Sequence, residues 1–427
     1  MEIQRYEDWS LEFHKQVVAQ RAPLSGSIEL TRRCNMKCTH CYNNLDTGHR
    51  ETMLGELTYE EHCRILDEIT DAGCLWLLYT GGEIFARPDF LDIYTYAKQK
   101  GLLLTLFTNG TLITPTIADY LTAWRPFSIE ISIYGRDPDT HDRITGIPGS
   151  FERCMKSIRL IMERDLPLIL KAMVLTLNKH EIWEIKRFVE EELGLEFRFD
   201  AMLNPRIDCS LSPLAVRLSP LEVVKLDLQD PKRMTGWTEF CEHFHGPAPK
   251  INGHHPLFTC GGGQNAFAID PEGKLSPCVL WGESTYDLRQ ESFRDGWEKF
   301  LLKLTQGEIT KKTKCLNCEI KAMCGMCPAN GQLEGGGPET PVDFLCQVAH
   351  LRAHVLGLSI PPHGECEYCE GGSKNQDLLQ SLAGLKSGLE EQPSGFEERS
   401  GDLQERLDSL EERPESLQDS RTKKGSC

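Results

Sequence analysis

The sequence has no stretch that would place the chain across a membrane or direct it out of the cell. Nowhere in its 427 residues is there an apolar run of about 18 residues, the length that a membrane-spanning helix needs. The segment Met1–Asp8 is polar and acidic and leads into no apolar segment, so no signal peptide is expected. These absences predict a cytoplasmic protein that has no membrane partner.

An excess of positive charge is also missing. The chain has 47 Lys and Arg against 64 Asp and Glu, a net charge of −17. Nucleic acids and anionic lipid surfaces attract basic proteins, so we expect neither as a partner. The 40% content of hydrophobic residues is enough for an ordinary core, and the length fits one or two domains.

Cysteine, by contrast, is abundant and unevenly distributed. Of the 18 cysteines, three lie within eight residues from Cys34, seven lie between Cys260 and Cys346, and two more are Cys366 and Cys369. Without a secretion signal a disulfide framework is the poorer interpretation. The cysteines therefore predict metal or redox chemistry.

Short apolar runs alternate with helical patterns over the first 210 residues. The expected strands are Ser27–Thr31, Leu75–Thr80, Leu102–Thr108, Ser128–Tyr134, Leu168–Leu175 and Glu196–Leu203. The expected helices are Thr58–Ala72, Phe90–Lys100, Pro115–Ala123, Phe151–Arg164 and Lys179–Leu193. Repeated βα units predict an α/β fold with a parallel sheet, which right-handed crossovers curl into a partial (β/α)6 TIM-like barrel.

The composition divides the chain into four regions. We expect an N-terminal extension at 1–26, the partial barrel at 27–211 and a cysteine-rich domain organised by metal at 212–372. A β-hairpin is expected in this domain at 266–277. The last region, 373–427, is polar and predicts a disordered or weakly helical tail.

Cys34, Cys38 and Cys41 follow the first expected strand directly, with spacings x3 and x2. Three thiolates on one short loop suit three irons of a cubane and leave the fourth iron open to another ligand. The alternative is a zinc knuckle, in which His40 or a distant residue is the fourth ligand.

Further motifs follow in order along the chain. Tyr42 comes after the last cysteine, and Gly81-Gly82-Glu83 follows the second expected strand. Thr108-Asn109-Gly110 ends the third strand, and Ser132 lies on the fourth. Together with the cysteine triad, these residues resemble the radical S-adenosylmethionine (SAM) superfamily. Ile84 departs from the pattern, because many members have proline after the Gly-Gly-Glu.

The resemblance implies an active site at the carboxyl ends of the barrel strands. It implies that Cys34, Cys38 and Cys41 hold a 4Fe–4S cluster. The residues that it implies for binding SAM are Gly81, Gly82, Glu83, Asn109 and Ser132. Among them, Glu83 would pair with the amino group of the methionine part, since a carboxylate binds an ammonium strongly.

The second set of cysteines resembles the SPASM domain of radical enzymes that modify peptides. The resemblance implies two auxiliary 4Fe–4S clusters. One would be held by Cys315, Cys318, Cys324 and Cys346, and the other by Cys260, Cys278 and Cys327. One or two structural zinc sites remain the alternative.

The resemblance names only three ligands for the cluster at Cys260, Cys278 and Cys327, so its fourth ligand is not assigned. The candidates for it are Cys241, His245, His254, His255 and Cys366, unless an open iron meets the substrate. The pair Cys366 and Cys369 is interpreted in three ways, as metal ligands, as a redox pair or as idle thiols.

The resemblance also implies the reaction. Reductive cleavage of SAM gives methionine and a 5′-deoxyadenosyl radical, which abstracts a hydrogen atom from a substrate, with a flavodoxin or ferredoxin as electron donor. The expected substrate is a ribosomally synthesised precursor peptide that receives a crosslink or thioether, with a separate leader-peptide-binding protein as a possible partner. Side-chain oxidation of the sulfatase type, tetrapyrrole or cofactor biosynthesis and, more remotely, a non-enzymatic zinc scaffold are the alternatives.

Overall fold

The computed structural model describes residue 13, residues 20–246 and residues 254–390. The chain divides into two compact units. The barrel unit consists of Met1–Leu218, Pro249–Lys312 and Met326–Val342. The helical unit consists of Ser219–Ala248, Thr313–Gly325 and Asp343–Cys427. The cysteine-rich region expected at 212–372 thus contributes segments to both units.

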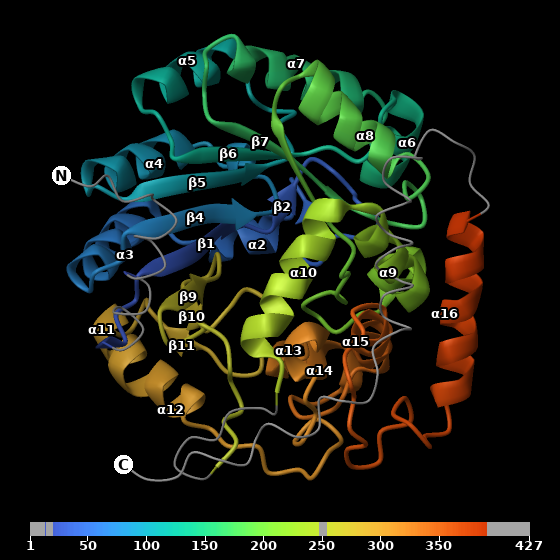
Figure 1. Ribbon diagram of the computed structural model, residues 1–427. Helices are drawn as coiled ribbons and strands as arrows, with labels where there is room; N and C mark the ends of the chain where they lie inside the picture. The colour runs from blue at the N-terminus through green and yellow to red at the C-terminus, as the bar shows by residue number, and fades with distance from the viewer. Residues whose placement is uncertain (1–12, 14–19, 247–253, 391–427) are drawn as a thin grey trace, which may run out of the picture. The chain divides into compact units, whose positions relative to one another are not determined.

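A nine-stranded sheet is the centre of the barrel unit (Figure 1). Its strands, from one edge to the other, are β11 (Tyr286–Asp287), β10 (Lys274–Ser276), β9 (Ala266–Ile269), β1 (Ser25–Thr31), β4 (Trp76–Gly81), β5 (Leu103–Thr108), β6 (Ser128–Ser132), β7 (Leu168–Met173) and β8 (Glu196–Asp200). The strands from β9 through β8 pair in parallel. A separate short ladder pairs β2 (Arg33–Cys34) with β3 (Leu45–Asp46).

Helices connect the parallel strands along the outside of the sheet (Figure 1). The helices of this unit are α2 (Arg50–Gly55), α3 (Tyr59–Asp71), α4 (Phe90–Gln99), α5 (Pro115–Ala123), α6 (Pro138–Thr145), α7 (Ser150–Met162), α8 (Ile182–Arg187), α11 (Phe293–Asp295), α12 (Leu302–Thr305) and α14 (Pro328–Gly335). Single turns of 3-10 helix lie at Ile84–Ala86 and Ser212–Val216, and π-helical turns lie at Phe188–Glu192 and Gly296–Leu301.

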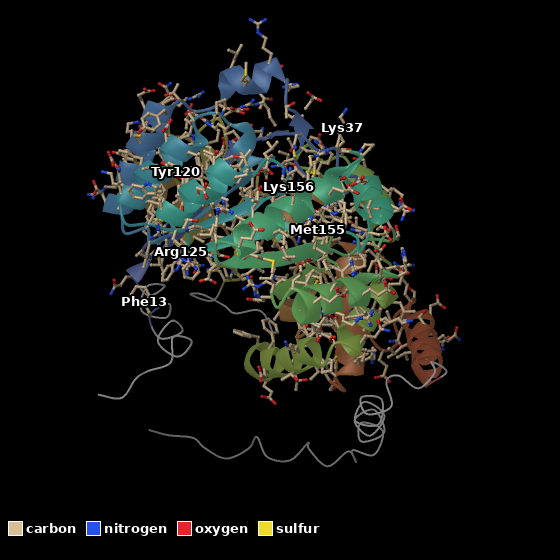
Figure 2. All side chains as sticks on the ribbon, turned by 90° about the horizontal axis from the view of Figure 1, so that it is seen from above. Phe13, Lys37, Tyr120, Arg125, Met155 and Lys156 are labelled. Atoms are coloured by element: carbon tan, nitrogen blue, oxygen red, sulfur yellow. The ribbon has the colours of Figure 1, made fainter. Side chains whose placement is uncertain are left out.

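The predicted partial barrel is confirmed. All six expected strands and all five expected helices are present, and no strand bound differs by more than three residues. Local signals explain this agreement. Thr58 and Glu61 form a capping box at the start of α3. On α7, Met155 is buried and its neighbour Lys156 is exposed, as the helical period requires (Figure 2).

The expected hairpin at 266–277 is an extension of the barrel's own sheet. β9 pairs in parallel with β1, in a register that places Gly26 opposite Phe267. A Cβ atom on Gly26 would lie 2.4 Å from the Cζ atom of the Phe267 ring. Only glycine therefore lets the Phe267 ring pack over β1, and this contact joins the two distant segments.

The helical unit contains α9 (Pro220–Gln229), α10 (Pro231–Phe244), α13 (Lys321–Cys324), α15 (Asp343–Val355) and α16 (Asn375–Glu390). A buried carboxylate links three of these helices. Asp227 of α9 accepts a hydrogen bond of 2.7 Å from Nε of Arg352 on α15 and another of 2.7 Å from Nη2 of Arg233 on α10. Two cations on separate oxygens satisfy the charge of the buried carboxylate.

Helix α16 occupies the first part of the segment expected to be a tail. Leu378 and Leu382 on this helix are buried, so residues 375–384 belong to the packed helical unit. The rest of the expected tail, residues 391–427, lies outside the described residues. In the described part of the chain, no helix combines the length and the apolar character that crossing a membrane requires.

We predict that Gly26→Ala lowers the free energy of unfolding by about 1–3 kcal/mol, because the added methyl group overpacks against Phe267. Gly236→Ala in α10 is the matched control, since nothing lies within 4 Å of the added Cβ. Alanine favours a helix over glycine, so the control should be neutral or stabilising. Thermal unfolding of both variants tests this, and equal melting temperatures would contradict the packing of β9 on β1.

Candidate active site and metal centres

The loop that carries the first three cysteines is held at its start by β2 and in its middle by helix α6. Cys34 ends β2, and the loop then crosses the last turn of α6. The Lys37 backbone N–H donates to the Thr145 carbonyl at 2.8 Å, and the Thr39 N–H donates to the Ile144 carbonyl at 3.0 Å. The last carbonyls of a helix have no hydrogen-bond partner within the helix. The backbone N–H groups of the loop therefore supply the donors for the last turn of α6.

The three thiols of this loop are in an environment that disfavours free thiolates. Burial raises the pKa of Cys34 to about 12, and it raises the pKa values of Cys38 and Cys41 as well. Each thiolate would also repel its neighbours in the triad. Thiolates in such a place need a cation beside them, and the donor set therefore fits a metal centre.

The geometry favours a cluster over a single zinc ion at this loop. Sulfur atoms around one tetrahedral zinc lie about 3.8 Å apart. Among the described residues, one group of His, Cys, Asp or Glu has all its ligand atoms within 4.8 Å of one another, and it contains none of the three cysteines. His40, the alternative fourth zinc ligand, packs edge-on against Tyr134 with ring centroids 4.7 Å apart. Burial lowers the pKa of His40 to about 4.

The glycine turn after β4 lies directly against the segment that leads to Cys34. A Cβ on Gly81 would lie 2.3 Å from the Thr31 carbonyl oxygen, and one on Gly82 would lie 2.3 Å from the Arg33 carbonyl oxygen. Gly81 also has a φ of 124°, in the region that favours glycine. Both glycines are therefore required for this backbone approach.

Glu83 is fully buried, and its carboxylate is hydrogen-bonded to other groups of the protein. It accepts hydrogen bonds from Thr108 Oγ1 at 2.7 Å, the Asn109 backbone N–H at 2.8 Å and the Phe85 backbone N–H at 3.1 Å. The carboxylate therefore ties the glycine turn to the end of β5. A direct contact of Glu83 with a ligand stays a prediction.

Most of the predicted site residues meet around one cavity of about 590 Å³. The predicted residues that line it are Cys34, Cys38, Cys41, Gly81, Gly82, Asn109 and Ser132. Asn109 donates from Nδ2 to Asn35 Oδ1 at 2.9 Å, and the same nitrogen lies 3.7 Å from Cys34 Sγ. A volume of this size holds one cofactor-sized molecule.

The sequence is similar to those of known proteins. Residues 28–189 match the radical SAM superfamily. A PqqA peptide cyclase of Ruegeria pomeroyi is 34% identical over 265 residues, which cover 60% of this chain and 68% of that protein. The chain belongs to the radical SAM superfamily. An AdoMet-dependent heme synthase of Methanosarcina barkeri is 28% identical over 342 residues, 75% of this chain and 95% of that protein.

The fold of a radical SAM enzyme is also found in solved structures. Streptococcus suis SuiB bound to SAM superposes with a TM-score of 0.60 at 18% identity, covering 81% of this chain and 82% of that one. The resemblance to the radical SAM superfamily is confirmed by the family match and the relatives, and with it the cofactors of that superfamily, SAM and a 4Fe–4S cluster. The three thiols and the cavity beside them fit this pair of cofactors.

The wall of the 590 Å³ cavity also contains a charged group that is not among the predicted site residues. Glu130 of β6, Lys171 of β7 and Arg198 of β8 all line it. Lys171 Nζ lies 3.6 Å from Glu130 Oε2, and Arg198 Nη1 lies 3.4 Å from Glu130 Oε1. The available signal was a charged residue inside an otherwise apolar strand, such as Glu130 between Ile129 and Ile131.

Two further residues that the sequence did not single out support the cysteine loop. Arg206 donates from Nη1 to the Cys41 carbonyl at 3.2 Å and from Nη2 to the Asn44 carbonyl at 3.2 Å. Glu29 accepts hydrogen bonds of 2.6 Å from the Tyr42 hydroxyl and from Asn43 Nδ2. These protein groups thus anchor the loop at Cys41 and over the three residues that follow it.

The three cysteines assigned to the first auxiliary cluster all belong to the barrel unit. Cys278 and Cys327 pack with Phe258, Trp281 and Ala329 in one apolar cluster. Burial raises the pKa of Cys278 to about 11, and the nearby Cys327 and Cys260 raise it further. The Cys327 sulfur accepts a hydrogen bond from the Asn330 backbone N–H and so caps α14.

The four cysteines assigned to the other auxiliary cluster all belong to the helical unit. Burial raises the pKa of Cys315, and the nearby Cys318 adds to this effect. Cys324 ends α13, and Cys346 lies in the first half of α15. Cys346 interacts with both Cys324 and Cys366.

The candidates for the missing ligand fall into both units. Cys241, His245 and Cys366 are in the helical unit, and Cys241 Sγ lies 3.1 Å from Met323 Sδ. His254 and His255 are in the barrel unit with Cys260, Cys278 and Cys327. His254 is exposed and pairs with Glu308 at 3.1 Å. The buried Nδ1 of His255 has no hydrogen-bond partner within the described residues.

We predict that Cys38→Ala abolishes formation of 5′-deoxyadenosine, because a radical SAM cluster needs all three thiolates of its loop. The auxiliary clusters should remain, since their proposed ligands are elsewhere. Cys63→Ala on α3 is the matched control and should leave turnover unchanged. The measurement is 5′-deoxyadenosine and iron per chain after anaerobic reconstitution, and turnover that survives in Cys38→Ala would contradict the assignment.

A second prediction concerns Lys171. Burial lowers the pKa of this lysine to about 7, and Glu130 opposes the shift. The amine is therefore charged below pH 7 and neutral above it, so labelling by a small amine-reactive probe should be half-maximal near pH 7. In Glu130→Gln the midpoint should move to lower pH, because the charge that raises the pKa is gone. Mass spectrometry of labelled peptides, with exposed lysines as internal standards, would contradict this if Lys171 reacted only at strongly alkaline pH.

Proposed function

We propose that this radical SAM enzyme modifies a side chain of a ribosomally synthesised peptide, forming a crosslink or thioether. The size of the cavity carries the proposal. About 590 Å³ suits one cofactor-sized molecule, so SAM fills most of it. The remaining space suits one side chain of an extended chain better than a second large ligand.

The residues of the site define what the protein itself contributes. Reductive cleavage of SAM at the cluster supplies a 5′-deoxyadenosyl radical that removes a hydrogen atom from the substrate. Gly81 and Gly82 bring the backbone close to the methionine part, and Asn109 and Ser132 offer polar contacts to the rest of the molecule. Burial around the loop excludes water from a reactive intermediate.

Lys171 is the group best suited to moving a proton in this cavity. A general acid or base works best when its pKa is near the operating pH, and the pKa of Lys171 is about 7. Glu130 on the neighbouring strand pairs with Lys171, and Arg198 on the other side pairs with the second oxygen of Glu130. We propose that Lys171 contacts the substrate beside SAM, since β7 lies two strands beyond β5, which ends just before Asn109, and Lys171 is paired with Ser132 on β6.

We also propose that two auxiliary clusters exchange electrons with the product radical or hold the substrate. Cys260, Cys278 and Cys327 would bind one, and Cys315, Cys318, Cys324 and Cys346 would bind the other. In support, each set lies within a single unit and combines thiols from separate segments. A flavodoxin or ferredoxin would supply electrons, and a separate protein would present the leader of the peptide.

Biosynthesis of a tetrapyrrole is the second candidate. Two observations favour it: the heme synthase relative is matched over 95% of its length, and Lys171 and Arg198 would pair with the carboxylates of a tetrapyrrole. Glu130 already neutralises part of that positive charge, which is the reason for preferring the peptide.

The deciding experiment offers both substrates to the reconstituted enzyme with SAM and a reductant. One arm uses the short peptides encoded beside its gene, and the other uses an iron tetrapyrrole that carries carboxylate side chains. We expect a peptide to lose two hydrogen atoms in step with formation of 5′-deoxyadenosine, and Cys38→Ala to give no product. Unchanged peptides together with loss of carbon dioxide from the tetrapyrrole would overturn the proposal in favour of the second candidate.

A further inference from the structure

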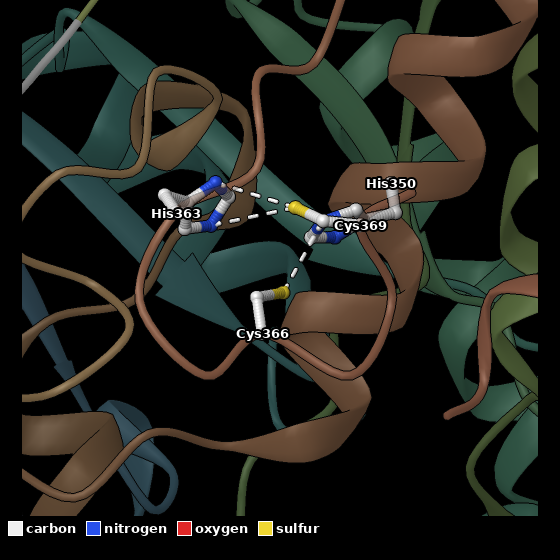
Figure 3. A group of neighbouring side chains, drawn as sticks. All are labelled: His350, His363, Cys366 and Cys369. Atoms are coloured by element: carbon white, nitrogen blue, oxygen red, sulfur yellow. Dashed lines mark hydrogen bonds between the residues drawn. The ribbon is translucent and has the colours of Figure 1, made fainter. Parts of the chain in front are cut away.

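Four metal-binding side chains converge in the helical unit, next to two of the cysteines assigned above to a cluster: Cys366 interacts with Cys346, and His363 interacts with Cys318. His350 is on α15, and His363, Cys366 and Cys369 are on the loop between α15 and α16 (Figure 3). One ligand atom from each lies within 4.8 Å of all the others. All four residues are buried, with 1–7% of their surface exposed. No other group in the described part of the chain is as compact.

The distances in this group fit a single tetrahedral ion. His350 Nε2 lies 3.5 Å from Cys366 Sγ and 3.5 Å from Cys369 Sγ. An ion with bonds of zinc length would separate a nitrogen and a sulfur ligand by about 3.6 Å. His363 Nε2 lies 3.9 Å from Cys369 Sγ, which is close to the same value. The group thus has the size of one ion and not of a cubane.

A backbone carbonyl oxygen contacts Nδ1 of each imidazole ring. His350 Nδ1 is 2.8 Å from the Cys346 carbonyl oxygen, and His363 Nδ1 is 3.0 Å from the Pro361 carbonyl oxygen. For His350, an N–H at Nδ1 that donates to the Cys346 carbonyl leaves the lone pair of Nε2 free on the side of the thiols. This is the usual support for a histidine that binds a metal. For His363, both ring nitrogens face Cys369, with Nδ1 at 3.3 Å and Nε2 at 3.9 Å from Cys369 Sγ.

The backbone of the loop is closed tightly around its two cysteines. The Gly372 N–H donates to the Cys369 carbonyl at 2.8 Å. A Cβ on Gly372 would lie 2.4 Å from the Glu367 carbonyl oxygen and 2.6 Å from that of Cys366. Glycine is therefore required where the loop turns back over the cysteine pair, and the turn presents both sulfurs to the same side.

We propose that His350, His363, Cys366 and Cys369 bind one zinc ion, separate from the iron–sulfur clusters. Two thiolates balance the charge of the ion and two imidazoles are neutral, so the buried site carries no net charge. Four protein ligands leave no open position, which makes the site structural rather than catalytic. The ion closes the loop 350–369 onto α15, the helix that also carries Cys346.

Metal analysis of the full chain tests this. Tag-free protein, purified anaerobically and reconstituted with iron, should contain about one zinc beside about twelve irons from three clusters. Cys369→Ser should reduce zinc at least tenfold and leave iron unchanged. Cys315→Ala should do the reverse, losing about four irons while keeping the zinc. Cys63→Ser is the matched control and should change neither metal.

X-ray absorption at the zinc edge of the unaltered protein gives a test that needs no variant to fold. We expect two sulfurs at about 2.3 Å and two nitrogens at about 2.0–2.1 Å. Absence of zinc from the unaltered protein, a shell of four sulfurs, or loss of iron together with zinc in Cys369→Ser would each overturn the proposal. A disulfide between Cys366 and Cys369 in the unaltered protein would overturn it too.

Discussion

The contact between the end of β4 and the backbone before Cys34 is the constraint on which the active site depends. The Gly82 N–H donates to the Thr31 carbonyl at 2.6 Å, and the Glu83 N–H donates to the Arg33 carbonyl at 2.9 Å. These bonds form only because Gly81 and Gly82 have no side chains. They fix the origin of the cysteine loop relative to the sheet.

From this contact the rest of the site follows strand by strand. Glu83, held at the turn, accepts hydrogen bonds from the end of β5 and so places Asn109. Asn109 reaches back to Asn35 in the cysteine loop. Each element is thereby positioned by its neighbour, and hydrogen bonds between protein groups alone connect the segments that bound the cavity. Such a framework lowers the cost of holding a reactive intermediate in one orientation.

What the sequence predicted correctly rests on local or repetitive signals. The strand and helix bounds follow from apolar periodicity and caps. Short motifs at strand ends indicated the cysteine loop, the glycine turn, Asn109 and Ser132; these residues line one cavity, and their roles as ligands stay predictions. No local motif or periodicity in the sequence indicates which distant segments pair with each other. The parallel pairing of β9 with β1 joins residues 266–269 to residues 25–28. It depends on the absence of a Gly26 side chain, whose meaning appears only once Phe267 is placed against it.

The site residues that the sequence did not indicate also depend on contacts between distant segments. Glu130, Lys171 and Arg198 come from three different strands, and only the register of the sheet shows that they meet. Helix α16 was expected to be at most weak because its sequence is polar, but two leucines one turn apart are enough to bury one face in the helical unit. In both cases the deciding energy comes from tertiary packing, which overrides local propensity.

The cysteines show that spacing in the sequence does not by itself separate one metal chemistry from another. Cys315–Cys318 and Cys366–Cys369 are both Cys-x2-Cys pairs in the same unit. What distinguishes them is what lies around them: the ligand atoms of the second pair and of His350 and His363 all lie within 4.8 Å of one another. Cys318 of the first pair also interacts with His363, but in the described part of the chain the first pair belongs to no group as compact. If the second pair binds zinc as we propose, its two imidazole ligands contribute to the choice of metal, because nitrogen ligands suit zinc better than a cubane. On this proposal, His350 and His363 are the features that separate a zinc site from the neighbouring cysteines proposed to bind iron.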